Sequence, residues 1–326
     1  MANLRHPDDG FRPVAWLRGP HLQTIVPNLV PAFGVGRPEE ERLIQVAPGN
    51  RLRVLIARPQ GSPRGTLVLV HGLGGSADSG YLIRTARMAL RREWIAVRVN
   101  LRNCGGTERL ATTLYNAGQS DDAGKVLEDL KAAGFPRPYA LMGFSLGGNL
   151  VLRYAGLAGE ACLADAVAAV NPPVDLEACV RCLEQPRNAF YQAYFTWRLC
   201  RLLRRIRRVR SISGPASDLW KVRTIRNFDG LFTAPDAGYE SAEEYYRSAS
   251  AGPHLASLSV PALLVSALDD PFVSAEIFAP HLGGDAGKLR ILQPRAGGHV
   301  GYWQGGAPRF WAGQMALEFL EYRAAR

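Results

Sequence analysis

The sequence predicts an α/β fold with a mostly parallel central sheet, helices on both faces and an inserted helical cap. Short apolar runs alternate with helical patterns from residue 66 to residue 170, which is typical of a parallel sheet covered on both sides. This rhythm is lost between about residues 171 and 257, where arginine-rich, aromatic and helical segments carry no clear strand. It returns from residue 261 onward, so one interrupted sheet explains both halves better than two independent domains.

Each element before the insertion follows from a local pattern. Residues 42–47 and 51–57 are rich in strand-forming residues and flank the turn Pro48-Gly49-Asn50, which predicts a hairpin. Continuous apolar runs then predict buried strands, and amphipathic patterns predict helices. The strands are expected at 66–70, 94–99, 139–142 and 166–170, and the helices at 81–92, 121–133 and 146–155.

The same patterns organise the rest of the chain. Strands are expected at 261–267 and 288–292, followed by a closing amphipathic helix at 307–322. We therefore expect residues 1–170 and 258–326 to form the two parts of one core. Residues 171–257 are expected to form the helical cap between them.

Composition indicates a folded protein of the cytoplasm. The 326 residues are 47% hydrophobic and 21% charged, and no apolar run approaches the roughly 18 residues of a membrane span. The N-terminus lacks the apolar core of a secretory signal, so a cytoplasmic location is expected. Five scattered cysteines argue against a disulfide framework. Cys179 and Cys182 form a lone CxxC without a second ligand pair, which favours free thiols over a metal or redox site.

Gly143-Phe144-Ser145-Leu146-Gly147 places a serine between glycines, at the spacing of the strand, turn and helix that carry the nucleophile of many hydrolases. The apolar run before it and the helical pattern after it supply that context. The glycines keep neighbouring side chains small enough for a sharp turn. Such matches also arise by chance in a chain with 34 glycines, so an ordinary glycine turn is the alternative.

A serine nucleophile needs a histidine base and a carboxylate that orients the histidine. In α/β-hydrolases the acid follows the serine in the chain, and the histidine follows the acid. Asp269 and Asp270 follow one expected strand, and His299 follows the next. We predict Ser145, Asp270 and His299 as catalytic residues, because the run from Asp270 to Val273 resembles the usual acid loop. Asp269 is expected to support them and is the alternative acid; a structural role is the alternative for His299.

His71-Gly72-Leu73-Gly74-Gly75 follows the first buried strand and matches a loop that donates a backbone N–H to a developing oxyanion. The residue after the nucleophile supplies the second donor. Leu73 and Leu146 are therefore the predicted oxyanion donors. A simple tight connection between strand and helix is the alternative for this loop.

With these motifs taken together, the chain resembles the YheT-like branch of the α/β-hydrolases, which includes ABHD-type lipid esterases and ethanol acyltransferase/esterases. The matching segments are 16–18, 20–24, 71–75, 143–149, 269–272 and 297–301. The resemblance implies the α/β-hydrolase fold and an esterase or acyltransferase that uses Ser145, Asp270 and His299. One motif differs: where many relatives carry HxxxxD, linked to acyl transfer, this chain has Asn116 in place of the histidine, five residues before Asp121.

Residues 197–210, WRLCRLLRRIRRVR, predict a basic amphipathic helix with Leu199, Leu202, Leu203, Ile206 and Val209 at helical spacing. We favour a cap helix whose apolar stripe covers the core while its arginines face water. Contact with an anionic membrane surface is the first alternative. Nucleic acid is not expected as a partner, because no nucleic-acid fold motif accompanies the net charge of +10.

The sequence thus predicts a serine carboxylic ester hydrolase acting on small-molecule acyl esters. No metal or organic cofactor is implied, because HExxH, paired CxxC and GxGxxG fingerprints are missing. The rival among enzymes is transfer of the acyl group to an alcohol. The rival from another class is a binding protein that uses the basic helix as its contact surface. The presence of all three residues, serine, aspartate and histidine, argues against this rival.

Overall fold

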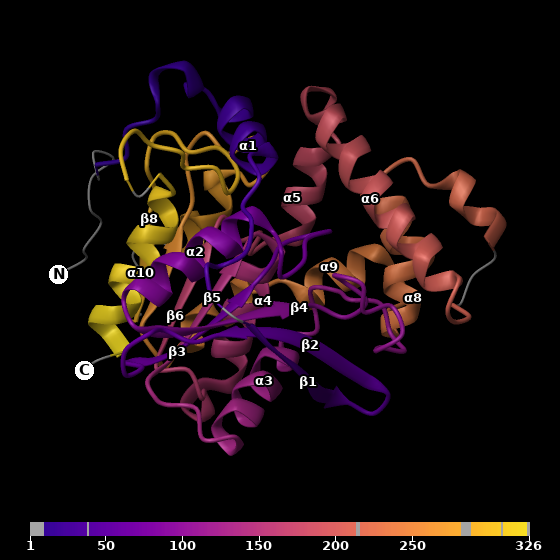
Figure 1. The fold of residues 1–326 in the computed structure, drawn as a ribbon. Helices are drawn as coiled ribbons and strands as arrows, with labels where there is room; N and C mark the ends of the chain where they lie inside the picture. The colour runs from indigo at the N-terminus through magenta and orange to yellow at the C-terminus, as the bar shows by residue number, and fades with distance from the viewer. Residues whose placement is uncertain (1–9, 38, 213–215, 282–287, 308, 325–326) are drawn as a thin grey trace.

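A sheet of eight strands lies at the centre of the computed structural model, which describes residues 10–37, 39–212, 216–281, 288–307 and 309–324 (Figure 1). The strands are β1 Glu39–Ala47, β2 Asn50–Ala57, β3 Gly65–Val70, β4 Trp94–Asn100, β5 Tyr139–Phe144, β6 Ala166–Val170, β7 Ala262–Val265 and β8 Leu289–Leu292. Their order across the sheet is β1-β2-β4-β3-β5-β6-β7-β8. β1 and β2 form the expected hairpin, β2 pairs antiparallel with β4, and all pairs from β4 to β8 are parallel. The predicted mostly parallel sheet is confirmed.

Helices cover both faces of the sheet, as the alternating pattern predicted (Figure 1). The helices outside the segment between β6 and β7 are α1 Pro20–Leu29, α2 Gly80–Arg91, α3 Asp121–Ala132, α4 Leu146–Ala158 and α10 Trp311–Ala324. Side chains of α2 and α10 share one apolar cluster with Leu67 and Leu69 of β3. Those of α3 and α4 share the other with Val68 and Val70. Because successive side chains of a strand point to opposite faces, β3 contributes to both clusters.

The segment between β6 and β7 forms helices and turns without a strand, in the part that the structure describes. The helices are α5 Leu176–Leu183, α6 Ala189–Arg207, α7 Ile225–Phe228, α8 Ala234–Ala237 and α9 Ala242–Ala249. Figure 1 shows α6 and α8 on the outer side of this segment, away from the sheet. A helical segment thus interrupts the strand order, while the limits 171–257 of a separate cap stay a prediction.

α6 contains the basic amphipathic pattern but has other bounds than those predicted. It begins at Ala189 rather than 197 and ends at Arg207 rather than 210. The prediction missed the first two turns because they are aromatic and lie outside the arginine pattern. Leu199, Leu203 and Ile206 are buried, so the apolar stripe faces the protein, whereas Val209 lies beyond the helix.

Two other elements are shorter than the patterns indicated. β7 spans Ala262–Val265 instead of 261–267, and α10 begins at Trp311 instead of 307. Before α10, Trp303 and Phe310 form an isolated bridge that delays the start of the helix. Both shortened ends adjoin the loops that hold the predicted acid and histidine.

Candidate active site

Ser145 lies in a sharp turn between the end of β5 and the start of α4. Its backbone angles, φ 52° and ψ −122°, fall in a region that residues with a side chain seldom adopt. The Ser145 N–H donates to Val170 O at the end of β6 (2.8 Å), which fixes the turn against the sheet. A Cβ at Gly143 would lie 2.1 Å from the Gly147 oxygen, and one at Gly147 would lie 2.5 Å from Val70 O. Both positions therefore require glycine.

His299 joins Ser145 to Asp270 through its two ring nitrogens. Nε2 lies 2.8 Å from Ser145 Oγ, and Nδ1 lies 2.8 Å from Asp270 Oδ2. The side chain of Asp270 is fully buried, that of His299 is 8% exposed, and the Phe272 ring packs against the imidazole with its centroid 4.2 Å away. With Nδ1–H donating to the carboxylate, Nε2 accepts from the serine hydroxyl. The three residues predicted to be catalytic thus lie in hydrogen-bond contact.

The two adjacent aspartates have different partners. Asp270 Oδ1 accepts from the backbone N–H groups of Phe272 (3.0 Å) and Val273 (2.9 Å), which fix the carboxylate opposite the imidazole. Asp269 Oδ1 accepts from the Gly298 N–H (2.8 Å), so this carboxylate braces the turn before the histidine. Burial raises the pKa of Asp269 above its ordinary value. Asp270 rather than Asp269 therefore contacts the imidazole.

Asn171, directly after β6, links the acid to the histidine loop, which comprises residues 297–301. Its Nδ2 donates to Asp270 Oδ2 (2.6 Å) and to Gly298 O (3.2 Å). Its Oδ1 accepts from the Val300 N–H (3.2 Å). Sequence reasoning missed this residue, whose one signal is its place at the carboxyl end of a buried parallel strand.

The N-terminal helix α1 supports the same loop from the other side. Thr24 Oγ1 accepts from the His299 N–H (2.9 Å). Gln23 Nε2 donates to Trp303 O (3.0 Å), and Gln23 Oε1 accepts from the Trp303 N–H (2.8 Å). Both residues belong to a segment of the family resemblance, but no local pattern predicts contact across 275 residues of sequence.

The oxyanion loop, residues 71–75, lies beside the serine, because a Cβ at Gly72 would lie 2.9 Å from Ser145 Cβ. His71 closes the base of this loop. Its Nδ1 contacts Gly72 O (2.8 Å), and its Nε2 accepts from the Leu101 N–H (3.1 Å). Burial lowers the pKa of His71 to about 4, so the imidazole is neutral at pH 7 with its proton on Nδ1. His71 is thus a structural part of the loop.

Two tyrosines and one arginine hold the glycines of the oxyanion loop. The Gly72 N–H donates to the Tyr81 hydroxyl (3.0 Å), and the Gly74 N–H donates to the Tyr115 hydroxyl (2.9 Å). Gly74 O accepts from Arg198 Nη2, which comes from α6. Helix α6 is therefore bonded directly to the loop beside the serine.

Ser145 lies where two cavities meet. The first extends beneath the helices of the segment between β6 and β7, and its largely apolar wall includes Leu73, Leu146, Leu176, Val180, Leu199 and Leu203. The second opens between α1 and α6 and is lined among others by Leu29, Tyr81, Phe190, Tyr194, Arg198 and His299. The predicted oxyanion donors Leu73 and Leu146 thus border a cavity that also contains the serine.

The comparison with known proteins agrees with this fold. The family model of the alpha/beta hydrolase fold matches residues 65–306. The chain belongs to the alpha/beta hydrolase fold family. It is similar to the Escherichia coli (strain K12) protein named "Putative esterase YheT", with 32% identity over 322 residues that cover 95% of this chain and 92% of that protein.

Two further comparisons show the range of the likeness. The monoacylglycerol lipase of Saccharomyces cerevisiae is 28% identical over 263 residues, which cover 78% of this chain and 58% of the yeast protein. The chain thus matches little more than half of that relative. The solved structure of the Pyrococcus furiosus esterase Pf2001 superimposes with a TM-score of 0.61 over 91% of this chain and 97% of that chain. At 16% identity, this last likeness shows the fold alone.

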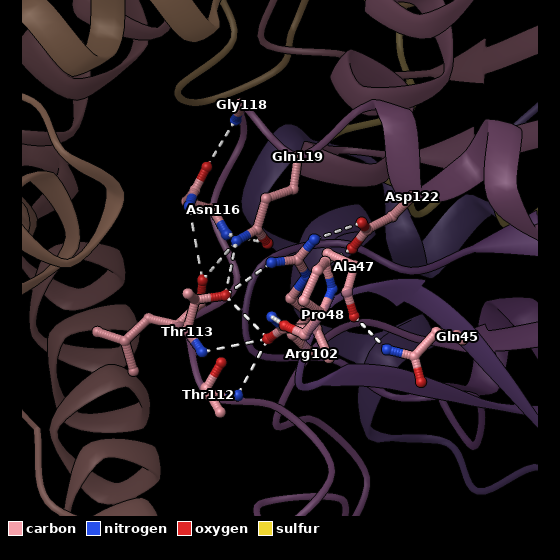
Figure 2. Close-up of polar contacts among 12 residues, drawn as sticks. Gln45, Ala47, Pro48, Arg102, Thr112, Thr113, Asn116, Gly118, Gln119 and Asp122 are labelled. Atoms are coloured by element: carbon pink, nitrogen blue, oxygen red, sulfur yellow. Dashed lines mark hydrogen bonds and ion pairs between the residues drawn. The ribbon is translucent and has the colours of Figure 1, made fainter.

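Residues 116–121 form the segment where the resemblance leads one to expect an HxxxxD motif. Figure 2 shows the polar contacts around Asn116, which stands where the histidine would be. Its Oδ1 accepts from the Gly118 N–H (2.9 Å), and its backbone N–H donates to Gln119 Oε1 (3.1 Å). Asn116 lines the first cavity, whereas Asp121 is exposed in the first turn of α3. Asn116 is therefore hydrogen-bonded within the turn 116–119, and its amide cannot act as the base that a histidine would provide.

A buried ion pair anchors this turn to the core (Figure 2). Arg102 binds both carboxylate oxygens of Asp122, with Nε to Oδ2 at 2.8 Å and Nη2 to Oδ1 at 2.5 Å. Arg102 Nη1 also donates to Thr113 Oγ1 (2.7 Å), which in turn donates to Asn50 Oδ1 (3.2 Å). Because the pair and its neighbours are hydrogen-bonded, they hold in place the turn whose Asn116 lines the first cavity.

The remaining sequence predictions concern thiols, metals and membranes. All five cysteines are free, and burial raises the pKa of the Cys104 thiol to about 12. Among the described residues, no three metal-ligating side chains gather in one place. In the same part of the chain, no helix combines the length and the apolar character needed to cross a bilayer.

We predict that His71 makes stability depend on pH. Because folding lowers its pKa from 6.5 to about 4, its contribution is complete above pH 6.5 and is lost as the pH falls toward 4. The free energy of unfolding should fall by about 2–3 kcal/mol more in the wild type than in His71→Asn between pH 7 and pH 4.5. Urea unfolding at both pH values checks this, and equal falls in the two proteins would contradict it.

Proposed function

We propose that this chain is a serine carboxylic ester hydrolase that works through an acyl-enzyme on Ser145. The observation that carries the proposal is the hydrogen-bonded line of Ser145 Oγ, His299 and Asp270 at the junction of two cavities. Relatives named as an esterase and a lipase support the same class of reaction.

In this mechanism, His299 Nε2 takes the hydroxyl proton while Ser145 Oγ attacks the ester carbonyl. Asp270 holds the imidazole in the required tautomer and stabilises the imidazolium. The N–H groups of Leu73 and Leu146 donate to the oxyanion of the tetrahedral intermediate. His299 then passes the proton to the departing alcohol, and a water molecule activated by the same histidine releases the acid.

The two cavities match the two halves of an ester. The apolar first cavity suits an acyl chain, because hydrocarbon gains free energy when it leaves water for such a wall. His299 lines the second cavity and not the first. The alcohol receives its proton from this histidine, so we place the alcohol in the second cavity.

Hydrolysis is favoured over its two rivals. Transfer to an alcohol is less favoured because Asn116, at the position of the motif histidine, is engaged in its own turn. Product analysis in water with added ethanol distinguishes the two reactions. A binding protein without turnover has no need for a serine, histidine and aspartate in hydrogen-bond contact.

We further propose residues 171–257 as a cap domain that completes the first cavity. Cap residues such as Leu176, Leu199 and Phe228 form the wall opposite Leu146 of the core. The acyl chain would thus lie between the cap and the core, so the cap would select its length and shape. Residues 1–170 and 258–326 are the two parts of the core in this proposal.

Peripheral contact with an anionic membrane is the proposed route to lipid esters, and a cytoplasmic location stays a prediction. The docking surface is the apolar rim of the second cavity rather than the arginine-rich end of α6. Arg205 there pairs with Glu108 (3.0 Å), and Arg207 packs over the Phe232 ring (5.2 Å), so these two guanidinium groups are already engaged within the protein.

The apolar rim consists of large exposed side chains on α1, the segment after it, and α6. They are Leu22 (46% exposed), Leu29 (74%), Phe33 (83%), Phe190 (65%), Tyr194 (40%) and Trp197 (52%). Phe190, Tyr194 and Trp197 follow helical spacing and form one stripe. His21 Nδ1 lies 2.9 Å from the Tyr191 hydroxyl, which joins α1 to α6. Exposed apolar groups around a cavity mouth are typical of lipid-contacting surfaces, and nearby arginines favour anionic lipid.

Ser145→Ala should abolish both ester hydrolysis and labelling by a fluorophosphonate probe, because among the described residues no other hydroxyl contacts the imidazole of His299. His299→Ala should lose activity by several orders of magnitude for want of a base. Turnover of p-nitrophenyl acetate and gel-based labelling measure both effects. Ser259→Ala, remote from the site, is the matched control. Unchanged turnover in Ser145→Ala would refute the proposed function.

Asp270→Asn should lose at least about a hundredfold more activity than Asp269→Asn, because an amide at Asp270 disfavours the productive tautomer of the histidine. Steady-state kcat/KM on a short ester gives the ranking. Both substitutions preserve side-chain volume, so each variant serves as the control for the other. The reverse ranking would assign the acid to Asp269.

The triple variant Leu22→Ser, Phe33→Ser and Trp197→Ser should weaken binding to phosphatidylglycerol vesicles by about a hundredfold, at about 1 kcal/mol per exposed apolar side chain. Hydrolysis of a short soluble ester should stay unchanged, because none of these three residues lines a cavity. Vesicle sedimentation at low salt measures the binding.

Leu43→Ser with Leu157→Ser is the control for that variant, because both leucines are exposed on other elements, β1 and α4. It should bind vesicles as the wild type does. Equal loss in the control and the triple variant would contradict the assignment to the rim. A wild-type protein that does not sediment with the vesicles would refute membrane contact.

A further inference from the structure

The first cavity contains a polar group that the proposed mechanism does not use. Its lining is mostly apolar, yet Asp229, Thr233, Tyr245 and Tyr246 also contribute to it. These residues come from α9 and from the π-helix Asp229–Thr233. In the described part of the chain, none of them is bonded to the residues around Ser145. π-helical turns are rare in proteins, and those that occur are often found at functional sites. This corner of the cavity is therefore a candidate for a separate binding role.

Asp229 is the central residue of this corner. It is 7% exposed and lines the cavity, and its Oδ2 accepts from the Tyr246 hydroxyl (2.8 Å). Burial raises the pKa of the Asp229 carboxyl to about 6. A carboxyl in such an apolar wall costs free energy unless its oxygens are hydrogen-bonded.

Among the described residues, no arginine forms an ion pair with this carboxyl. Arg226 acts on Asp229 electrostatically but is bonded to three other carboxylates, those of Glu177 (3.0 Å), Glu184 (2.9 Å) and Glu243 (2.8 Å). The carboxyl of Asp229 therefore faces the cavity with hydroxyl groups, not a cation, as its neighbours.

Two tyrosines that line the same cavity, Tyr115 and Tyr245, have hydroxyl groups whose protons are available for a further hydrogen bond. The Tyr245 hydroxyl accepts from the Ala117 N–H (2.9 Å), and the Tyr115 hydroxyl accepts from the Gly74 N–H (2.9 Å). Among the hydrogen bonds of the described residues, neither hydroxyl donates its own proton. The cavity thus offers both an acceptor, at Asp229, and donors, at the two tyrosines.

We propose that Asp229, Tyr115 and Tyr245 form a subsite for a hydroxyl group on the acyl chain of the substrate. A hydroxyl both donates and accepts, so it can bond the carboxylate and a tyrosine together. A plain hydrocarbon chain leaves these polar groups facing carbon, which is unfavourable. The inference rests on the proposed function, because it names the acyl class that the same site prefers: hydroxyacyl esters.

The test compares p-nitrophenyl esters of straight-chain acids, from butyrate to dodecanoate, with esters of the same chains bearing a terminal hydroxyl. In the wild type, kcat/KM should favour the hydroxy ester by about tenfold or more at the chain length that reaches the subsite. Asp229→Asn and Tyr245→Phe should each reduce this preference severalfold, measured within each variant as the ratio of kcat/KM for the hydroxy ester to kcat/KM for the plain ester. Asp236→Asn is the matched control, because that half-buried acid does not line the cavity.

The outcomes separate the subsite from the proposed function. A preference below twofold at every chain length, or one that survives both Asp229→Asn and Tyr245→Phe, overturns the subsite while hydrolysis stands. If no ester is hydrolysed, the proposed function fails, and calorimetric binding of the free acids to Ser145→Ala still decides the inference. Hydroxy acids should then bind about tenfold more tightly than plain acids of equal length, and equal affinities would overturn the subsite.

Discussion

The close packing of the Ser145 turn against the ends of β3 and β6 is the constraint on which the rest of the site depends. A Cβ at Gly147 would overlap Val70 O, and the Ser145 N–H is bonded to Val170 O, so the turn has one position relative to the sheet. The strained backbone angles of the serine are maintained because the surrounding strands over-determine them. All loops that meet the serine hydroxyl leave the same edge of a parallel sheet, and the sheet therefore sets their approach.

The histidine loop depends on supports that are distant in sequence. Thr24 of α1 accepts from its backbone, Asn171 after β6 bonds both the acid and the loop, and Asp269 bonds its glycine turn. A loop rich in glycine has much conformational freedom in the unfolded chain, so these bonds restrict it to one orientation. The 2.8 Å contacts of the imidazole on both sides are the result of bracing by three separate segments.

Local patterns predicted the parts of the site that lie within a few residues of one another. The turn around Ser145, the order of Asp270 and His299, and the loop 71–75 follow from glycine spacing and strand ends. The supports Thr24, Asn171 and Tyr115 were not predicted, because their partners are brought near only by tertiary folding. The first turns of α6 were missed for another reason: they are aromatic and lie outside the arginine pattern that marks the rest of the helix. The alternation of strands and helices predicted the sheet, since burial of both faces is a property of the whole pattern.

The bond between Arg198 of α6 and Gly74 O has a consequence for the timing of a catalytic cycle. Gly74 is also held by the Tyr115 hydroxyl, so the carbonyl and the amide of this one residue are bonded to two different parts of the chain, one of which is α6. A displacement of α6 that widened the entrance would remove the guanidinium from the carbonyl and relax the neighbouring Leu73 peptide. A substrate could then not enter while the oxyanion loop was in its catalytic conformation. The enzyme would become fully active only after α6 had moved back and re-formed the bond between Arg198 and Gly74.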